Sequence, residues 1–259
     1  MQVSFFIPAY NYARYLGQAI ASIMDRNFED GDEIVVCNDG STDNTAKELE
    51  RLQQIWPHIK IITHQKNQGG GAARNTAIRQ CNNPILFCLD ADNFLAPGCI
   101  PKLKQFLIDN EADVAALREM HYFGSLPEVV RWPMDIVTLE HYLQGASVPG
   151  CSGNYMFTKA SWERVGGYPE DTWLDAWGFG FRQVAHGFKI MVMPDGHYYH
   201  RRGHDSYYMR GLRECSASQA ALLVLREFFH LLDERDVDYV LHSDDWYDRL
   251  QERPLRLRA

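Results

Sequence analysis

The sequence lacks paired cysteines of the kind that bind zinc or form a redox motif. Six cysteines are scattered through the 259 residues, and no C-x-x-C pair occurs among them. Three lie in or beside apolar segments, so we expect reduced thiols that serve mainly as packing residues in a cytoplasmic protein. The six are Cys37, Cys81, Cys88, Cys99, Cys151 and Cys215.

Long apolar runs and long basic runs are also missing. No stretch of about 18 apolar residues occurs, so no membrane-spanning helix is expected. The chain starts with a strand-like segment and has no charged leader region, so no secretory signal is expected. The net charge of −8 and the lack of a Lys/Arg block argue against nucleic acid as the main partner.

Two nucleotide-binding fingerprints are absent as well. The glycines at 69–71 do not complete G-x-G-x-x-G, because Arg74 occupies the last place, and no G-x-x-x-x-G-K-[ST] occurs. These absences exclude the dinucleotide-binding and P-loop motifs and disfavour an NAD-linked oxidoreductase. The same glycines either let the backbone approach a phosphate at a helix N-terminus or form a flexible turn.

What the sequence does contain is an alternation of strand-like and helical segments through its first part. Apolar strand candidates lie at 3–7, 33–37, 59–62 and 85–89, and apolar residues recur at helical spacing between them. Pro8 is expected to end the first strand. The alternation predicts a parallel sheet covered by helices, with ligands bound at the carboxyl ends of the strands.

Acidic residues follow two of these strands. Asp90 and Asp92 come directly after the strand candidate 85–89, and Asp39 follows 33–37. Alternate strand residues share a face, and two adjacent carboxylates are costly there unless a cation or hydrogen-bond donors compensate. A hard divalent ion is the simplest compensation, and a solvated loop is the alternative.

The second part of the chain has a weaker pattern. We expect a helix over 97–110, strands over 114–117 and 189–193, and a long helix over 216–232. Residues 121–150 show no clear period and are interpreted as including acceptor-side loops. The tail at 253–258 alternates arginine with leucine. We interpret this tail as a frayed end, with contact to an anionic membrane surface as the alternative.

Residues 3–93 resemble the nucleotide-binding half of family 2 glycosyltransferases with the GT-A fold. The matching stretches are I-P-A-Y-N at 7–11, N-D-G-S-T-D at 38–43, N-Q-G at 67–69 with R-N at 74–75, and L-D-A-D at 89–92. The resemblance implies an α/β fold with a mainly parallel mixed sheet flanked by helices. It implies one domain over 1–259, made of a Rossmann-like nucleotide-sugar-binding half (1–95), an acceptor-binding and catalytic half (96–210) and a helical extension (211–259).

The resemblance also implies roles for individual residues. Asp39 would accept a hydrogen bond from uracil or ribose, Asp90 would touch ribose, and Asp92 would hold Mg²⁺ or Mn²⁺ on the diphosphate. Asn93 stands where the family often has a third acid, which leaves the metal site one charge weaker. The other residues that would border the nucleotide-sugar are Pro8, Ala9, Tyr10, Asn11, Gly71, Arg74 and Ala91.

A catalytic base is implied by the segment before a predicted helix. The family usually has Glu-Asp there and an arginine further on. Alignment on Arg182 puts Asp175 at the first acidic place and Ala176 at the second. We therefore expect Asp175 to be the base, with Asp171 or Glu170 as substitutes. A helix N-cap is the alternative role for Asp175.

A late histidine is the remaining expected metal ligand. Family members often supply one, and His200 fits best, with His204 and His197 as the alternatives. Arg201 and Arg202 would close over the diphosphate, unless they belong to a solvated loop.

These features predict a metal-dependent, inverting hexosyl- or N-acetylhexosaminyltransferase. It would move the sugar of a UDP-sugar to a hydroxyl of a glycan or lipid-linked acceptor, in the cytoplasm or at the inner face of the membrane. No oligomeric state is assigned. The alternative is a non-catalytic sugar-nucleotide-binding or scaffold protein, which Ala176 favours because one acid of the expected pair is missing.

Overall fold

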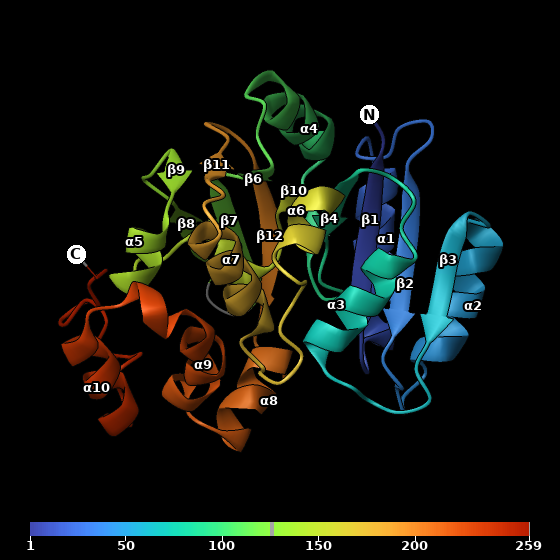
Figure 1. Ribbon diagram of the computed structural model, residues 1–259. Helices are drawn as coiled ribbons and strands as arrows, with labels where there is room; N and C mark the ends of the chain where they lie inside the picture. The colour runs from blue at the N-terminus through green and yellow to red at the C-terminus, as the bar shows by residue number, and fades with distance from the viewer. Residues whose placement is uncertain (125–126, 259) are drawn as a thin grey trace.

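The computed structural model describes residues 1–124 and 127–258, without the side chains at positions 151 and 152. Its first part alternates strands with helices, coloured blue to teal in Figure 1. These elements are β1 (Val3–Ala9), α1 (Ala13–Met24), β2 (Glu33–Asn38), α2 (Thr45–Ile55), β3 (Ile59–Thr63), α3 (Gly70–Arg79) and β4 (Ile85–Cys88).

The later part consists of shorter elements, most of them two to six residues long in the region before α7. They are β5 (Phe94–Leu95), α4 (Cys99–Asp109), β6 (Val114–Ala116), β7 (Glu119–Gly124), β8 (Val129–Arg131), β9 (Ile136–Val137), α5 (Leu139–Leu143), η1 (Pro149–Ser152), β10 (Met156–Thr158), α6 (Lys159–Arg164), α7 (Asp175–Ala185), β11 (Ile190–Val192), β12 (His197–Arg202), α8 (Tyr207–Glu214), α9 (Ala217–Leu225), η2 (Arg226–Leu231) and α10 (Glu234–His242).

The main sheet has the strand order β3-β2-β1-β4-β10-β6-β11-β9. Strands β3, β2, β1 and β4 run parallel to one another, and so do β6 and β11. Strands β10 and β9 are antiparallel to their neighbours. The mixed, mainly parallel sheet predicted from the sequence is therefore confirmed. The strand order reverses between β1 and β4, and a crevice outside the carboxyl ends of such strands is the usual ligand site.

Each face of this sheet has its own hydrophobic core. In β1, Val3, Phe5 and Ile7 point toward the face covered by α1, α2 and α4, whereas Phe6 points toward the face covered by α3, α7 and α9. Less than 2% of the surface of each of these side chains is exposed, and burying one large apolar side chain contributes about 1.5–3 kcal/mol. Packing on both faces fixes the position of the strand ends.

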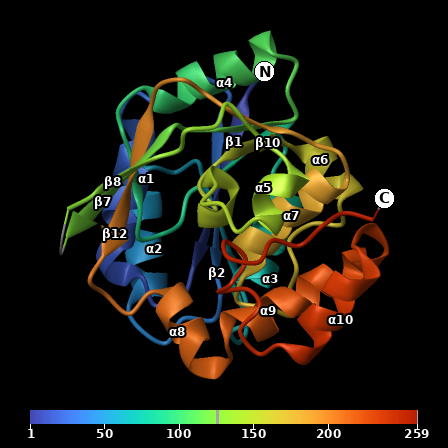
Figure 2. The same ribbon diagram turned by 90° about the vertical axis from the view of Figure 1, so that its left-hand side faces the viewer.

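A second sheet, ordered β5-β12-β7-β8, lies beside the main one (Figure 2). Strand β12 pairs in parallel with β7, from His197 opposite Glu119 to Arg202 opposite Gly124. The intervening Tyr198 is buried in the α1-side core. Because alternate strand residues face opposite ways, this sheet presents one face to the core and the other outward.

The expectation that Pro8 ends the first strand is wrong. Strand β1 continues to Ala9, and Pro8 pairs with Cys37 of β2. On the other side, the pairing of β1 with β4 ends at Phe6, so no ladder partner requires an N–H from Pro8 there.

The region 121–150 contains β8, β9, α5 and the end of β7, whose lengths are too short to give a visible period. The long helix expected over 216–232 is in fact α9 followed by the 3-10 helix η2 from Arg226. The helix expected over 97–110 is α4, which begins after Gly98 in the left-handed conformation.

The basic tail is packed against the protein, so its interpretation as a frayed end is wrong. Leu255 is only 4% exposed, and its N–H donates to the carbonyl of Leu143 at 2.9 Å. Arg256 donates to the buried carboxylate of Asp236. Arg258 pairs with Glu234 of α10.

Five of the six cysteines are free thiols, and four of these are buried, which agrees with the packing role expected of them. The side chain of Cys151 lies outside the described residues. Among residues 1–124 and 127–258, no helix combines the length and the apolar composition that crossing a bilayer requires.

Candidate active site

A cleft of about 1270 Å³ opens at the carboxyl ends of β1, β2 and β4, at the reversal of strand order. The cleft is also lined by residues of β7 and β12, by the segments before α7 and α8, and by α8 itself. Most of the residues predicted for the nucleotide-sugar site line this cleft, namely Pro8, Ala9, Tyr10, Asp39, Arg74, Asp90, Ala91 and Asp92.

The carboxylate of Asp39 holds the glycine loop in place. It accepts hydrogen bonds from the N–H groups of Gln68 and Gly69, both at 2.9 Å, and from the side chain of Asn67 at 3.0 Å. His64 Nδ1 lies 2.7 Å from the same carboxylate. A carboxylate has about four lone-pair sites. The contacts with His64 and with the loop that leads into α3 therefore occupy the carboxylate of Asp39.

Arg74 joins two acids that are far apart in the sequence. From α3 it donates to Asp90 Oδ1 at 2.7 Å and to Asp175 Oδ2 at 2.5 Å. Its guanidinium also lies over the ring of Tyr168, 5.6 Å from the ring centre. All of these groups are buried or nearly so, and the Nε of Arg74 has no hydrogen-bond partner among the described residues. The bridge places the predicted base beside the D-x-D segment.

Asp90 is fixed by amide side chains as well. Its N–H donates to Asn154 Oδ1 at 3.0 Å, and Asn154 Nδ2 donates back to Asp90 Oδ2 at 3.1 Å. Asn93, which replaces the third acid, lies between Asp90 and His200, with its Nδ2 3.3 Å from His200 Nδ1. Asn93 therefore orients neighbouring side chains where an acid would have added charge.

Asp92 contacts the later histidine rather than the one that fitted best in the sequence. His204 Nε2 lies 2.8 Å from Asp92 Oδ2, and the His204 ring packs against Tyr12 and Tyr15. Burial alone would raise the pKa of Asp92, but the hydrogen bond from His204 and the nearby His200 hold it below its ordinary value. Asp92 is therefore ionised at neutral pH.

The residues around Asp92 fit a hard divalent cation bound together with phosphate. Such ions commonly take only one or two carboxylates from the protein and complete their coordination with phosphate oxygens and water. His200 and His204 both line the cleft near Asp92. Nδ1 of His204 is buried without a hydrogen-bond partner among the described residues, so this ring retains an unused polar atom.

Asp175 is the first residue of α7 and is 2% exposed. The N-cap is Leu174, so the alternative role of Asp175 as the N-cap is wrong. Burial raises the pKa of Asp175 to about 6, although Arg74 and the N–H of Ala176 oppose this rise. A carboxylate with a pKa just below neutral is suited to accept a proton at physiological pH.

The two substitute bases are engaged elsewhere, although both line the cleft. Glu170 accepts a hydrogen bond from Asn75 at 2.7 Å, and Asp171 accepts one from Arg226 at 3.0 Å. Both side chains are about half exposed. Their exposure to solvent makes each a weaker candidate for the base than the buried Asp175.

Two residues predicted for the nucleotide site make structural contacts within the protein. Asn11 adopts a positive φ of 61°, and its side chain accepts hydrogen bonds from the N–H groups of Thr42 and Asp43. A Cβ on Gly71 would lie 2.0 Å from the carbonyl oxygen of Pro169, so this glycine allows α3 to approach that segment. Neither residue lines the cleft.

The two arginines after β12 also have protein partners. Arg201 donates to the carbonyl of Asp92 at 3.1 Å and lies over the ring of Tyr15. Arg202 donates to Glu128 at 2.8 Å and stacks on Tyr122. Both line the cleft, with Arg201 closer to Asp92 through its direct hydrogen bond.

Sequence reasoning missed several tyrosines in the cleft, among them Tyr12 and Tyr207. The hydroxyl of Tyr207 accepts a hydrogen bond from the N–H of Gly70, and that of Tyr12 accepts one from the N–H of Tyr207, both at 3.3 Å. Burial raises the pKa of both tyrosines above their ordinary value. Tyr12 directly follows the 7–11 motif, but nothing in the sequence places Tyr207 beside it.

The chain matches the family model "Glycosyl transferase family 2" over residues 4–165. It is 39% identical over 98 residues to the chondroitin synthase of Escherichia coli, which is 38% of this chain and 14% of that protein. It is 30% identical over 178 residues to the hyaluronan synthase of Pasteurella multocida, which is 65% of this chain and 17% of that protein. The chain thus spans less than a fifth of the length of these relatives.

Solved structures share the fold at low sequence identity. S. aureus TarS 1-349 in complex with UDP-GlcNAc has a TM-score of 0.73 and 19% identity, covering 97% of this chain and 70% of that one. The mannosyltransferase PcManGT from Pyrobaculum calidifontis, in complex with GDP-Man and Mn²⁺, has a TM-score of 0.68 and 17% identity, covering 96% and 72%. These likenesses bear out the GT-A fold expected from the sequence.

Proposed function

Because this chain belongs to glycosyl transferase family 2, whose model matches more than half of it, we propose that its cleft transfers a sugar from a UDP-sugar to an acceptor hydroxyl. One observation carries the proposal. The ionised Asp92 and the Arg74–Asp175 pair lie in a single cleft at the reversal of strand order. The first provides a place for a cation-bound diphosphate, and the second provides a buried base.

The donor nucleotide would bind over the carboxyl ends of β1 and β2, within residues 1–95. Pro8, Ala9 and Tyr10 line this end of the cleft and would form the base pocket. Asp39 would support the pocket through the loop at 67–69 that it holds. The N-terminus of α3, which begins at Gly70 in the cleft, favours an anionic group through its N–H groups and dipole.

We assign a Mg²⁺ or Mn²⁺ ion to Asp92, with His200 or His204 as its second protein ligand. When bound, such an ion neutralises charge that develops on the leaving diphosphate. Arg201 adds positive charge on the same wall of the cleft. Tyr12 and Tyr207 stay protonated and can donate hydrogen bonds toward the donor, because burial raises the pKa of both.

The transfer would be a single displacement with inversion at the anomeric carbon. The acceptor oxygen forms a bond to that carbon, the bond from the carbon to the diphosphate oxygen breaks, and the acceptor proton goes to the carboxylate of Asp175. Arg74 keeps Asp175 in position and links it to Asp90.

The acceptor would be a glycan or a lipid-linked sugar, and Trp173 and Tyr208 provide aromatic surfaces for it in the 96–210 part.

A non-catalytic sugar-nucleotide-binding protein is the second candidate. The observation that favours it is the 2.5 Å contact between Arg74 and Asp175, which ties up one carboxylate oxygen of the base. In addition, the uncharged Ala176 stands at the second position of the expected acidic pair, after Asp175. In this case the cleft would bind the donor without transferring its sugar.

Calorimetric titration of UDP, with and without Mn²⁺, tests the donor site. We expect Mn²⁺ to tighten UDP binding in the wild type, and Asp92→Asn to remove most of this Mn²⁺ effect. Asp238→Asn, an exposed acid on α10, is the matched control and should behave like the wild type. The assignment of the metal would be refuted if the affinity for UDP changed neither on addition of Mn²⁺ nor with Asp92→Asn.

A screen of UDP-sugars for hydrolysis or transfer then separates the two candidates. Activity that Asp175→Asn abolishes, while UDP binding is retained, supports the transferase. Retained binding without any turnover across the donor panel supports the non-catalytic protein. The same panel distinguishes hexosyl from N-acetylhexosaminyl donors.

A further inference from the structure

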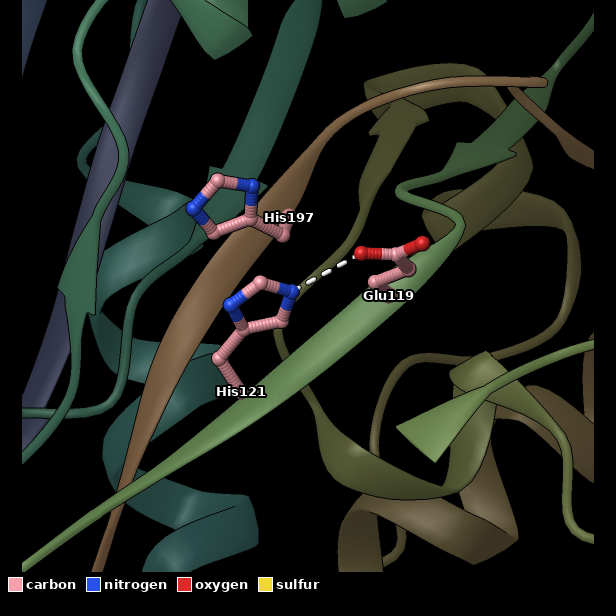
Figure 3. Close-up of side chains that lie close together, drawn as sticks. All are labelled: Glu119, His121 and His197. Carbon is pink, nitrogen blue, oxygen red and sulfur yellow. Dashed lines mark hydrogen bonds and ion pairs between the residues drawn. The ribbon is translucent and has the colours of Figure 1, made fainter. Parts of the chain in front are cut away.

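Three side chains with metal-binding groups gather on the outward face of the second sheet (Figure 3). Glu119 and His121 are two residues apart on β7, so they point to the same side of the strand. His197 lies directly opposite Glu119 on β12. The pairing of the two strands therefore brings all three groups together.

The geometry of the cluster is compact. His121 Nε2 lies 2.8 Å from Glu119 Oε2, and the rings of His121 and His197 are nearly parallel, with centres 4.0 Å apart. One ligand atom from each of the three residues lies within 4.8 Å of the other two. All three residues are partly exposed, so an ion from solution can reach them.

We propose that Glu119, His121 and His197 form a second cation site, selective for Zn²⁺ or a similar late transition metal. Two imidazole nitrogens and one carboxylate oxygen are a common protein donor set for Zn²⁺, with bonds of about 2.0–2.2 Å. Mg²⁺ and Mn²⁺ favour oxygen ligands and are disfavoured by this set. Small side-chain rotations would bring the three atoms to one ion, and water would complete the tetrahedron.

Neighbouring side chains already orient two of the ligands. Arg131 pairs with Oε1 of Glu119, which leaves Oε2 directed at His121. The hydroxyl of Tyr199 lies 3.2 Å from Nε2 of His197. Such outer contacts commonly fix the orientation of metal ligands.

This site is separate from the cleft. Met120 and His200 belong to the same two strands but line the cleft, whereas none of the three proposed ligands does. An ion here would join β7 to β12, whose residues are far apart in the sequence. It would therefore stabilise the strand that leads to His200 and His204 without touching the nucleotide-sugar.

Zinc titration of the full chain, freed of any affinity tag, tests the proposal. The probe is Zn²⁺ by calorimetry, with Co²⁺ as a spectroscopic substitute whose visible bands report four-coordinate geometry. We expect one Zn²⁺ to bind at this site, and His121→Gln and His197→Gln each to weaken that binding by roughly tenfold or more. We also expect Zn²⁺ to raise the Tm of the wild type by more than that of either variant.

His200→Gln is the matched control, because it removes a histidine from the same strand but from the cleft side. It should keep the Zn²⁺ bound by the outer face, and so should Asp92→Asn. Near-UV circular dichroism of each variant confirms folding before titration. Zinc binding that is unchanged in both His121→Gln and His197→Gln, or the absence of any zinc site in the wild type, would overturn the proposal.

Discussion

At the scale of single residues, the cleft is a place where buried acids outnumber the buried cation that pairs with them. Asp90 and Asp175 share Arg74, while Asp92 relies on His204. Burial raises the pKa of Asp175 to about 6 and also raises that of Asp90, whereas Asp92 remains below its ordinary value. Neighbouring acids with different pKa values suit different tasks, one holding a cation and the other accepting a proton.

The raised pKa of Asp175 predicts an acidic limb in the pH profile of the enzyme. Asp175, the proposed base, is protonated below about pH 6, so kcat/KM should be full above neutral pH and fall about tenfold per pH unit below 6. Asp175→Asn should lower kcat by at least about 100-fold at pH 7.5. Initial rates from pH 5 to 8, with the best UDP-sugar donor, provide the measurement.

Stability provides the control for this variant. A raised pKa means that the folded protein favours the protonated, neutral form of Asp175. The stability that this form contributes to the folded state is lost as the pH rises through about 6. Asp175→Asn should therefore leave the Tm at pH 7.5 unchanged or higher. A large fall in Tm together with the lost activity would point to a structural role.

Which of these residues the sequence could predict depends on how local the signal is. Asp90 and Asp92 were predicted because an apolar strand directly precedes them. The choice among three histidines was not settled, because β12 is polar and aromatic and gave no strand signal. Had that strand been recognised, its alternation would have put His197 and His200 on opposite faces.

At the scale of elements, long apolar strands and amphipathic helices were predictable, whereas strands of two or three residues were not. Strands β5 and β9 each contain two residues, and only their tertiary partners define them. Helix α3 has a different constraint, because its glycines permit a close approach that no periodicity reveals. Gly71 packs against the carbonyl of Pro169, in the segment that leads to Asp175.

Two glycine substitutions in helices should therefore have opposite effects. Gly71→Ala places a methyl group 2.0 Å from a backbone oxygen, so we expect a loss of about 1–3 kcal/mol in the free energy of unfolding. Gly17→Ala in α1 meets its nearest atom at 3.4 Å, so we expect a gain of about 0.5–1 kcal/mol. Urea denaturation of both variants measures the two effects.

The two variants control for each other, because each replaces one glycine by alanine and so restricts the unfolded chain to the same extent. Equal effects of the two substitutions would contradict the close approach of α3 to Pro169. Because that segment leads to the proposed base Asp175, Gly71→Ala should also reduce turnover, and Gly17→Ala should not.

At the scale of the whole molecule, the C-terminal segment is part of the structure and not an appendage. The side chain of Asp236, in α10, is 2% exposed and accepts three hydrogen bonds from Arg256. The sequence suggested a frayed basic end, with membrane contact as the alternative, because sequence alone does not show that acids of α10 pair with Arg256 and Arg258. Only the folded chain brings these charges together.

Asp236→Asn should detach this segment in part. We expect a loss of about 1–3 kcal/mol in the free energy of unfolding at pH 7, because the charge-assisted hydrogen bonds to a buried carboxylate are weakened. Burial alone would raise the pKa of Asp236, but the hydrogen bonds from Arg256 hold it below its ordinary value. The wild type loses this stabilisation as the pH falls below about 4, so the difference between the two proteins should shrink there.

Asp238→Asn, on the exposed side of the same helix, is the control and should change the stability by less than about 0.5 kcal/mol. Chemical denaturation at pH 7 and at pH 3.5 compares the three proteins. An effect of Asp236→Asn that does not depend on pH would argue against the ion pair as its cause.

The parallel pairing of β7 with β12 has a consequence for how the chain folds. Contacts between residues distant in the sequence form slowly, because a long loop must close first. The segment 1–95 can condense from neighbouring strands and helices as it is synthesised, whereas β12 joins its sheet only after residue 202 has been made. Asp92 is therefore present in a partly folded chain before His200 and His204 arrive. We expect the Mn²⁺-dependent part of donor binding, which is proposed to need one of these histidines, to be acquired last as the chain folds.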